Sequence, residues 1–208
     1  MAIGDGANDV NMITAAHIGV GILGLEGQQA ARSADYSIGQ FQFLKNLLFV
    51  HGREAYRRNS YLVLYMFYKN LIFVLPIFYY GYYSCFSGTS IYDIFIYQSF
   101  NLIYTGMPIC WYCTFDQQYK KEVFLQYPQL YKIGLQNQCF NKVVFAKWYF
   151  YGIWQSAFIL FLSLNALNNV DEYSLDLQGT HIVEAIVLLV TLKIFFSTFS
   201  HTFYSILF

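Results

Sequence analysis

The sequence predicts a mostly helical membrane protein, in which a bundle of four transmembrane helices follows a smaller polar segment of mixed α/β structure. Hydrophobic residues make up 57% of the 208 residues and charged residues only 12%, against about 25% charged residues in an ordinary soluble domain. The chain also changes character near residue 60, where a glycine-rich polar segment gives way to long apolar stretches. The formal net charge is zero, and we expect no nucleic-acid partner.

Four apolar stretches account for the predicted transmembrane helices, at residues 61–83, 94–113, 146–167 and 182–207. An α-helix rises about 1.5 Å per residue, so about 20 residues cover a hydrocarbon core of about 30 Å. Buried helices of a soluble bundle are the alternative, but such helices seldom run this far without charges. We expect Pro76 to interrupt the first stretch and Gly106-Met-Pro108 the second, because proline removes a backbone donor.

The basic residues predict the orientation of these helices. Ten of the twelve Lys and Arg residues lie in residues 1–60 and 114–147, whereas the connectors 84–93 and 168–181 contain none. Lys and Arg accumulate on the cytosolic side of membrane proteins. We therefore expect the N-terminus, the 114–145 connector and the C-terminus to be cytosolic.

The polar segment shows short alternations of strand and helix signals. Ala2 and Ile3 are expected to end a strand, and residues 8–16 to form a helix opened by an Asn or Asp cap. Residues 18–22 and 36–38 are apolar runs typical of short strands. Residues 41–58 are expected to be helical.

Residues 3–9 read Ile-Gly-Asp-Gly-Ala-Asn-Asp, a strand end followed by a turn and a helix start. Glycines let the backbone approach a phosphate closely, and a helix N-terminus favours negative charge. Asp5 and Asp9 supply the hard oxygen ligands that Mg²⁺ prefers, and Asn8 can donate to a phosphoryl oxygen. The alternative is an Asx-rich turn that only caps a helix.

This loop resembles the Gly-Asp-Gly-x-Asn-Asp signature of P-type ATPases. Other segments resemble the type IV subfamily, the phospholipid flippases, and the resemblance covers nearly the whole chain, weakening after about residue 140. The segments that carry it are Ala15–Ile22, Glu26-Gly27, Ala30–Tyr36, Gln40-Phe41, Val50–Arg53, Phe67–Asn70, Phe86–Gly88, Tyr92-Asp93, Phe100-Asn101, Phe115–Gln117 and Pro128–Tyr131.

The resemblance implies a role for each segment. Residues 1–40 would be the C-terminal part of an α/β haloacid-dehalogenase-like phosphorylation domain, and residues 41–60 a stalk helix. Asp5 and Asp9 would hold Mg²⁺, with Asn8 and Asp9 ordering the bound nucleotide. The substrate residues would be Lys69, Asn70 and Asn101, lining the path of the lipid headgroup.

The resemblance also implies a function, namely ATP-driven movement of a phospholipid from the exoplasmic to the cytosolic leaflet. The cofactors would be Mg²⁺ and ATP, the location the plasma membrane or an endomembrane, and the partner a two-span accessory subunit. The Asp-Lys-Thr-Gly-Thr sequence that carries the phosphorylated aspartate is absent. We therefore expect a C-terminal fragment of a longer flippase that is inactive by itself.

Two alternatives stay open from the sequence, a fragment of a cation-transporting P-type ATPase and a non-catalytic four-span membrane protein. Residues 61–83 and 94–113 contain no Asp or Glu but do contain Lys69, which favours a phosphate-bearing cargo over a cation. Lys193, in the last predicted span, is expected to have a structural partner within the bundle, because a charge at the span centre costs at least about 2.5–3.5 kcal/mol.

Overall fold

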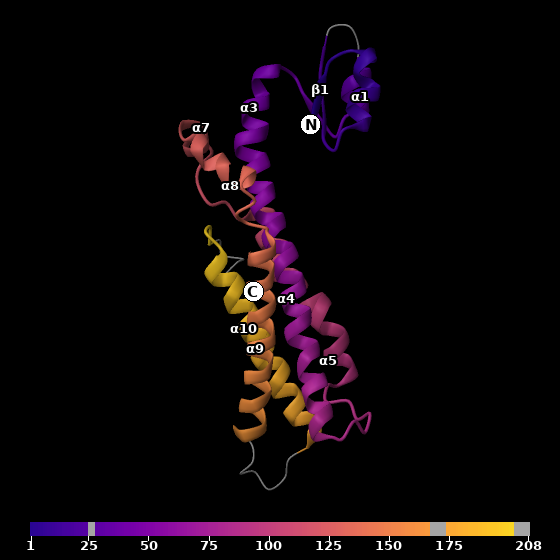
Figure 1. Ribbon diagram of the computed structural model, residues 1–208, viewed down its shortest axis with the longest axis vertical. Helices are drawn as coiled ribbons and strands as arrows, with labels where there is room; N and C mark the ends of the chain where they lie inside the picture. Colours follow the sequence, from indigo (N-terminus) through magenta and orange to yellow (C-terminus); the bar gives the residue numbers. More distant parts are fainter. Residues whose placement is uncertain (25–27, 167–173, 202–208) are drawn as a thin grey trace. The chain divides into compact units, whose positions relative to one another are not determined.

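The computed structural model describes residues 1–24, 28–166 and 174–201 (Figure 1). The chain divides into two compact units, the first made of residues 1–53 and 120–131 and the second of residues 54–119 and 132–208.

A small parallel sheet organises the start of the first unit. Its strands are β1 (Ala2–Gly4), β2 (Gly19–Ile22) and β3 (Tyr36–Ile38), paired in the order β1-β2-β3. Parallel strands need crossover connections, which contain helices α1 (Val10–Ala15) and α2 (Gln29–Ser33). The core is formed by Ile13, Val20 and Ala30, each at most 1% exposed. The three strands expected from the sequence are thereby confirmed.

The two glycines of β2 allow the helices to pack closely on the sheet. A Cβ atom at Gly21 would lie 2.6 Å from the Cα of Ala31, and one at Gly19 would lie 2.5 Å from the Cγ2 of Ile13. The Asp35 carboxylate also accepts a hydrogen bond from the Gly19 amide at 2.8 Å. The Gly-x-Gly pattern therefore serves helix packing.

Residues 41–58 are helical, as expected, but the type of helix changes along them. A 3-10 turn (Phe41–Phe43) leads into α3 (Leu44–Asn46), a π-helix (Leu47–Gly52) and the start of α4 (Arg53–Tyr83). Within the first unit, α7 (Lys121–Gln126) and a 3-10 turn (Pro128–Tyr131) pack against this segment. Arg53 donates from Nε to the Leu130 carbonyl at 3.2 Å and lies 4.7 Å from the Phe124 ring centroid.

The second unit is a helical bundle. Its elements after α4 are α5 (Ile94–Ser99), the π-helix η4 (Phe100–Tyr104), α6 (Gly106–Phe115), α8 (Lys132–Leu135), α9 (Lys142–Ala166) and α10 (Leu175–Ser197). Aromatic rings dominate its core. The Phe73 ring stacks on Phe100 at 3.9 Å and on Tyr92 at 4.8 Å between centroids, which joins α4 to the segment before α5 and to η4.

The two proline positions behave differently. The prediction that Pro76 interrupts its helix is wrong, since α4 runs unbroken for 31 residues. Proline removes the donor that would bond to the carbonyl of Ile72, four residues back. The Tyr92 hydroxyl donates to the neighbouring carbonyl, that of Phe73, at 3.1 Å. The second stretch is broken, as predicted, into α5, η4 and α6.

Within the described parts of the chain, two helices are long and apolar enough to cross a membrane, the continuous helix Phe41–Tyr83 and α10. Of the other predicted spans, α9 has 25 residues and the stretch 94–113 is broken by η4. The ends of the third and fourth predicted spans, at residue 167 and residues 202–207, lie outside the described residues.

Candidate functional site

Lys69 is among the most deeply buried charged residues of the bundle, with 1% of its surface exposed. Its ammonium group donates to the Thr105 hydroxyl at 2.8 Å, and Thr105 donates in turn to the Phe100 carbonyl at 2.8 Å. The described residues offer Lys69 no carboxylate partner. A single neutral acceptor leaves two of the three ammonium donors without a partner in the described structure.

The local backbone explains why Thr105 faces Lys69. Thr105 ends the π-helix, where its amide donates five residues back to the Phe100 carbonyl at 3.1 Å. Pro108 lacks an amide hydrogen, and a Cβ atom at Gly106 would lie 2.8 Å from the Asn101 carbonyl oxygen. The Gly-Met-Pro sequence thus stabilises a break in regular helix, and π-helical turns occur frequently at functional sites.

The other two predicted substrate residues belong to the same two elements, but they are exposed. Asn70 follows Lys69 on α4, and Asn101 is the second residue of η4. The structure pairs Lys69 with Thr105, a residue that the sequence prediction missed. The available signal was its place beside the Gly106-Met-Pro108 break.

Lys193 has aromatic rather than acidic partners. Its ammonium group lies 3.5 Å from the centroid of the Tyr68 ring, 3.9 Å from that of Trp148 and 5.9 Å from that of Tyr151. A cation over an aromatic face contributes about 2 kcal/mol when it is desolvated. The expected structural partner in the bundle is therefore a set of rings from α4 and α9.

A second polar cluster lies where α4 begins and where α6 and α10 end. Arg57 donates to Glu54 at 2.8 Å and to the Tyr112 hydroxyl at 3.1 Å, and its Nη2 lies 2.8 Å from Asp116 Oδ2. The contact with Asp116 Oδ2 is an ion pair, and this oxygen accepts no hydrogen bond within the described residues. Burial lowers the pKa of Arg57, but Glu54, Tyr112 and Asp116 together raise it above its ordinary value, so this side chain stays charged at neutral pH.

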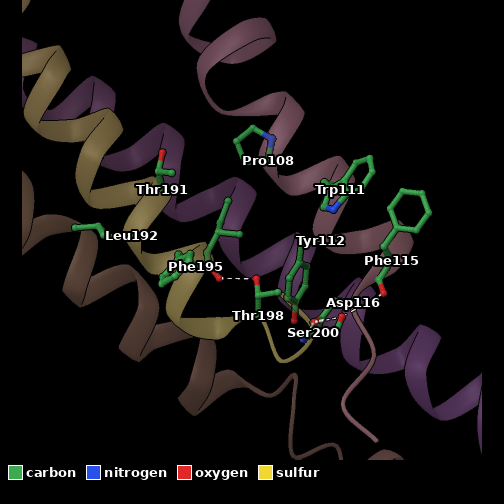
Figure 2. Close-up of a pocket in the computed structure, with 11 residues that line it drawn as sticks. Pro108, Trp111, Tyr112, Phe115, Asp116, Thr191, Leu192, Phe195, Thr198 and Ser200 are labelled. Carbon is green, nitrogen blue, oxygen red and sulfur yellow. Dashed lines mark hydrogen bonds between the residues drawn. The ribbon is translucent and has the colours of Figure 1, made fainter. Parts of the chain in front are cut away.

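An apolar cavity of about 260 Å³ lies between α6 and α10, next to this cluster (Figure 2). Pro108, Trp111 and Phe115 line it from α6, and Leu192 and Phe195 line it from α10. Figure 2 shows Asp116 and Ser200 hydrogen-bonded to each other at one end of the cavity.

In the first unit, Asp5 follows β1 and its side chain is exposed, as is that of Asn8. The Asp9 carboxylate turns back into the loop, where Oδ2 accepts from the amides of Asp5 at 3.1 Å and of Gly6 at 3.4 Å. A Cβ atom at Gly4 would lie 2.3 Å from that of Asp9, so this packing requires glycine. Asp9 therefore shapes the loop. Its side chain caps the amide of Gly6 at the start of the 3-10 turn Ala7–Asp9, but it does not cap α1 itself.

The loop fits Mg²⁺ in part. The exposed Asp5 carboxylate is a suitable hard-oxygen ligand, whereas one oxygen of Asp9 is engaged with the backbone. Among residues 1–24, 28–166 and 174–201, no three His, Cys, Asp or Glu side chains converge as a metal site.

Comparison with known proteins agrees with the resemblance. The family model of the phospholipid-translocating P-type ATPase C-terminal region matches residues 31–208. Phospholipid-transporting ATPase DRS2 of Saccharomyces cerevisiae is 48% identical over 159 residues, which are 76% of this chain and 12% of the relative. Probable phospholipid-transporting ATPase IM of Homo sapiens is 41% identical over 209 residues, which are 98% of this chain and 18% of the relative.

The chain thus spans less than a fifth of the length of these relatives. The family match covers both the Lys69–Thr105 contact and the Arg57 cluster. The chain belongs to the type IV P-type ATPases, the phospholipid-transporting ATPases, within which residues 31–208 correspond to the C-terminal region.

Proposed function

We propose that this chain forms the C-terminal membrane part of an ATP-driven flippase, which moves a phospholipid from the exoplasmic to the cytosolic leaflet. The observation that carries the proposal is the Lys69 ammonium group, buried within an apolar helix and hydrogen-bonded to a single neutral hydroxyl. Such a cation is costly in a membrane, and an anionic headgroup passing it would relieve that cost. The phosphate is the part of the cargo that Lys69 would attract.

The charge at this position argues against a transported cation. Cation sites need carboxylate or carbonyl oxygens, and the described residues around Lys69 supply a hydroxyl and no carboxylate. Asn70 and Asn101 are neutral, exposed amides on the same elements, and they would donate to phosphate or ester oxygens along the path.

The proposed topology has four spans, with residues 1–60, 114–145 and the C-terminus in the cytosol. The first span, residues 61–83, lies within the continuous helix Phe41–Tyr83, and the last overlaps α10; both helices are long and apolar enough to cross a membrane. The contacts of Arg57 with Asp116, and of Asp116 with Ser200, support this topology, because they gather the start of α4 and the ends of α6 and α10 at one end of the bundle. An even number of crossings between these points produces that arrangement.

The catalytic part of the proposal concerns residues 1–40, as the end of a haloacid-dehalogenase-like phosphorylation domain. Asp5 would be a Mg²⁺ ligand, with Asp9 and Asn8 ordering the loop around phosphate and ATP. The chain lacks Asp-Lys-Thr-Gly-Thr, so by itself it would not form a phosphoenzyme. A two-span accessory subunit is the expected partner in the complete transporter.

The test uses a full-length relative in which this chain replaces the segment that it matches. The unmodified graft should hydrolyse ATP in a lipid-stimulated manner and move fluorescent phospholipid across the bilayer of proteoliposomes. Lys69→Ala should reduce lipid stimulation more than phosphoenzyme formation. Lys120→Ala, an exposed lysine outside the predicted spans, is the matched control.

Two results would contradict the proposal. A graft that forms phosphoenzyme but moves no phospholipid excludes this chain as the transport part. Wild-type lipid stimulation in Lys69→Ala removes Lys69 from the headgroup path.

A further inference from the structure

Asp116 lies where three segments that are distant in sequence meet. It follows α6 directly, and its side chain has no exposed surface. Oδ1 accepts from the amides of Phe199 at 2.8 Å and Ser200 at 3.0 Å, and from the Ser200 hydroxyl at 3.3 Å. Since these donors belong to the segment after α10, Oδ1 ties the end of α6 to the end of α10.

The other carboxylate oxygen connects Asp116 to the first turns of α4. Oδ2 lies 2.8 Å from Arg57 Nη2, and the same guanidinium donates to the Tyr112 hydroxyl and to Glu54. Glu54 accepts in addition from the Gln118 amide at 3.4 Å. Arg57 is therefore held both by its own helix and by the end of α6.

The distances along the helices show that this cluster is one of two levels at which α4 and α6 contact each other. On α4, Arg57 precedes Lys69 by 12 residues, a rise of about 18 Å. Thr105, the partner of Lys69, precedes Asp116, the partner of Arg57, by 11 residues. Helices α4 and α6 are thus antiparallel and joined at two levels, once at the candidate headgroup residue and once at the start of α4.

We propose that Asp116 is a positioning residue that couples α4 to α6 and α10, and that its ion pair with Arg57 carries a displacement of α4 to the Lys69–Thr105 level during transport. The proposal rests on the proposed function, in which α4 carries the headgroup lysine. Oδ1 and Oδ2 have separate tasks. Oδ1 binds the segment after α10 through its hydrogen bonds to Phe199 and Ser200. Oδ2 forms the ion pair with Arg57, so a displacement of Arg57 would act on that segment through Asp116.

The substitution Asp116→Asn separates these tasks. The Asn side-chain oxygen can still accept from Phe199 and Ser200, but the charge facing Arg57 is lost. The matched control is Asp93→Asn, because Asp93 also accepts from two backbone amides through Oδ1, at 2.8 and 3.3 Å, and it is exposed. The described residues place no cation beside Asp93.

The measurement is the amount of phospholipid moved per ATP hydrolysed, in proteoliposomes containing the full-length relative grafted with this chain. In Asp116→Asn this ratio should fall by about tenfold, the change expected from losing one charge-assisted contact, while phosphoenzyme still forms. Asp93→Asn should leave the ratio unchanged. Arg57→Gln should lower it as Asp116→Asn does, and Arg57→Lys should restore part of it.

The double variant Arg57→Gln/Asp116→Asn should be no worse than either single variant, because both remove the same contact. If the two effects multiply, or if Asp116→Asn matches Asp93→Asn, the coupling role is wrong. If Asp116→Asn yields too little folded protein, Arg57→Gln becomes the deciding variant, since it leaves the Oδ1 contacts in place. An unchanged ratio of phospholipid moved to ATP hydrolysed in Arg57→Gln would then overturn the proposal. An unmodified graft that moves no lipid overturns the proposed function instead.

Discussion

The ammonium group of Lys193 lies 3.5 Å from the centroid of the Tyr68 ring. The main-chain carbonyl of Lys193 accepts from the Tyr61 hydroxyl at 3.3 Å, seven residues before Tyr68 on α4. The lysine side chain therefore extends along α4, away from the start of that helix. The centroid of the Trp148 ring lies 3.9 Å from the same ammonium group, and the two rings form an edge-to-face pair. A charge in an apolar helix is here stabilised by ring faces instead of a carboxylate.

This arrangement predicts that the contribution of Trp148 to the free energy of unfolding depends on Lys193. Trp148→Leu should lower the free energy of unfolding by about 2 kcal/mol beyond lost packing, the strength of a desolvated cation–π contact. In a Lys193→Met background, where no cation remains, the same substitution should remove only the packing contribution. Thermal unfolding of the four proteins in detergent measures the difference as a double-mutant cycle.

The control for this cycle is Tyr68→Phe. It keeps the ring under Lys193 but removes the hydroxyl that donates to Gln155, so its effect should be the same in the wild-type and the Lys193→Met backgrounds. Equal effects of Trp148→Leu in both backgrounds would show that the ammonium group gains nothing from the indole.

Substitution of Thr105 should impair the transporter as much as substitution of Lys69, because Thr105 is the hydrogen-bond acceptor of that lysine. Thr105→Val keeps the shape of the side chain and leaves the buried ammonium group without a partner, which costs about 1–3 kcal/mol or more for a charged group. We expect a lower melting temperature and a weaker lipid stimulation of ATP hydrolysis in the grafted transporter. Thr105→Ser retains the hydroxyl and should resemble wild type, and identical behaviour of the Val and Ser variants would exclude a role for the hydroxyl.

The sequence predicted local structure well where residues close together in the sequence determine it. The glycine-bounded apolar run at residues 18–22 predicted β2, the shorter signals at residues 2–3 and 36–38 predicted β1 and β3, and Gly106-Met-Pro108 predicted the break between η4 and α6. Pro76 did not break its helix, because the loss of one donor in a long helix is small beside the packing of the whole helix. The expected roles of Asp5, Asn8, Asp9, Asn70 and Asn101 stay predictions.

Partners of the buried charges could not be predicted from the sequence. Lys69 and Thr105 are separated by 36 residues, and Arg57 and Asp116 by 59. Which side chains meet depends on the rotation of each helix about its own axis. In helices that are apolar on nearly every face, such as α9 and α10, the hydrophobic pattern does not specify that rotation.

Two glycines in the bundle should respond differently to alanine. A Cβ atom at Gly179 on α10 would lie 1.8 Å from the Ile91 carbonyl oxygen, a backbone atom. One at Gly152 on α9 would lie 2.8 Å from Leu71 Cδ2, the end of a flexible side chain. Gly179→Ala should therefore destabilise the protein by at least about 1–3 kcal/mol, the usual effect of overpacking, and Gly152→Ala by less. Thermal unfolding of both variants tests this, and a larger loss for Gly152→Ala would contradict the close packing of Gly179 on residue 91.

Substitutions of Asp5 and Asp9 should have different effects, although both residues lie in the loop Gly-Asp-Gly-Ala-Asn-Asp. Asp5 is exposed and its carboxylate makes no hydrogen bond or ion pair within the described chain, whereas Asp9 holds the amides of Asp5 and Gly6. Asp5→Ala should leave the melting temperature of the grafted transporter unchanged and abolish its Mg²⁺-dependent phosphoenzyme, because a hard-oxygen ligand is lost. Asp9→Ala should lower both, since two backbone donors lose their acceptor at about 1 kcal/mol each. Phosphorylation by labelled ATP over a range of Mg²⁺ concentrations measures the first effect. Normal phosphoenzyme with unchanged Mg²⁺ dependence in Asp5→Ala would refute the metal role, and an unaltered melting temperature in Asp9→Ala would show that its hydrogen bonds do not support the loop.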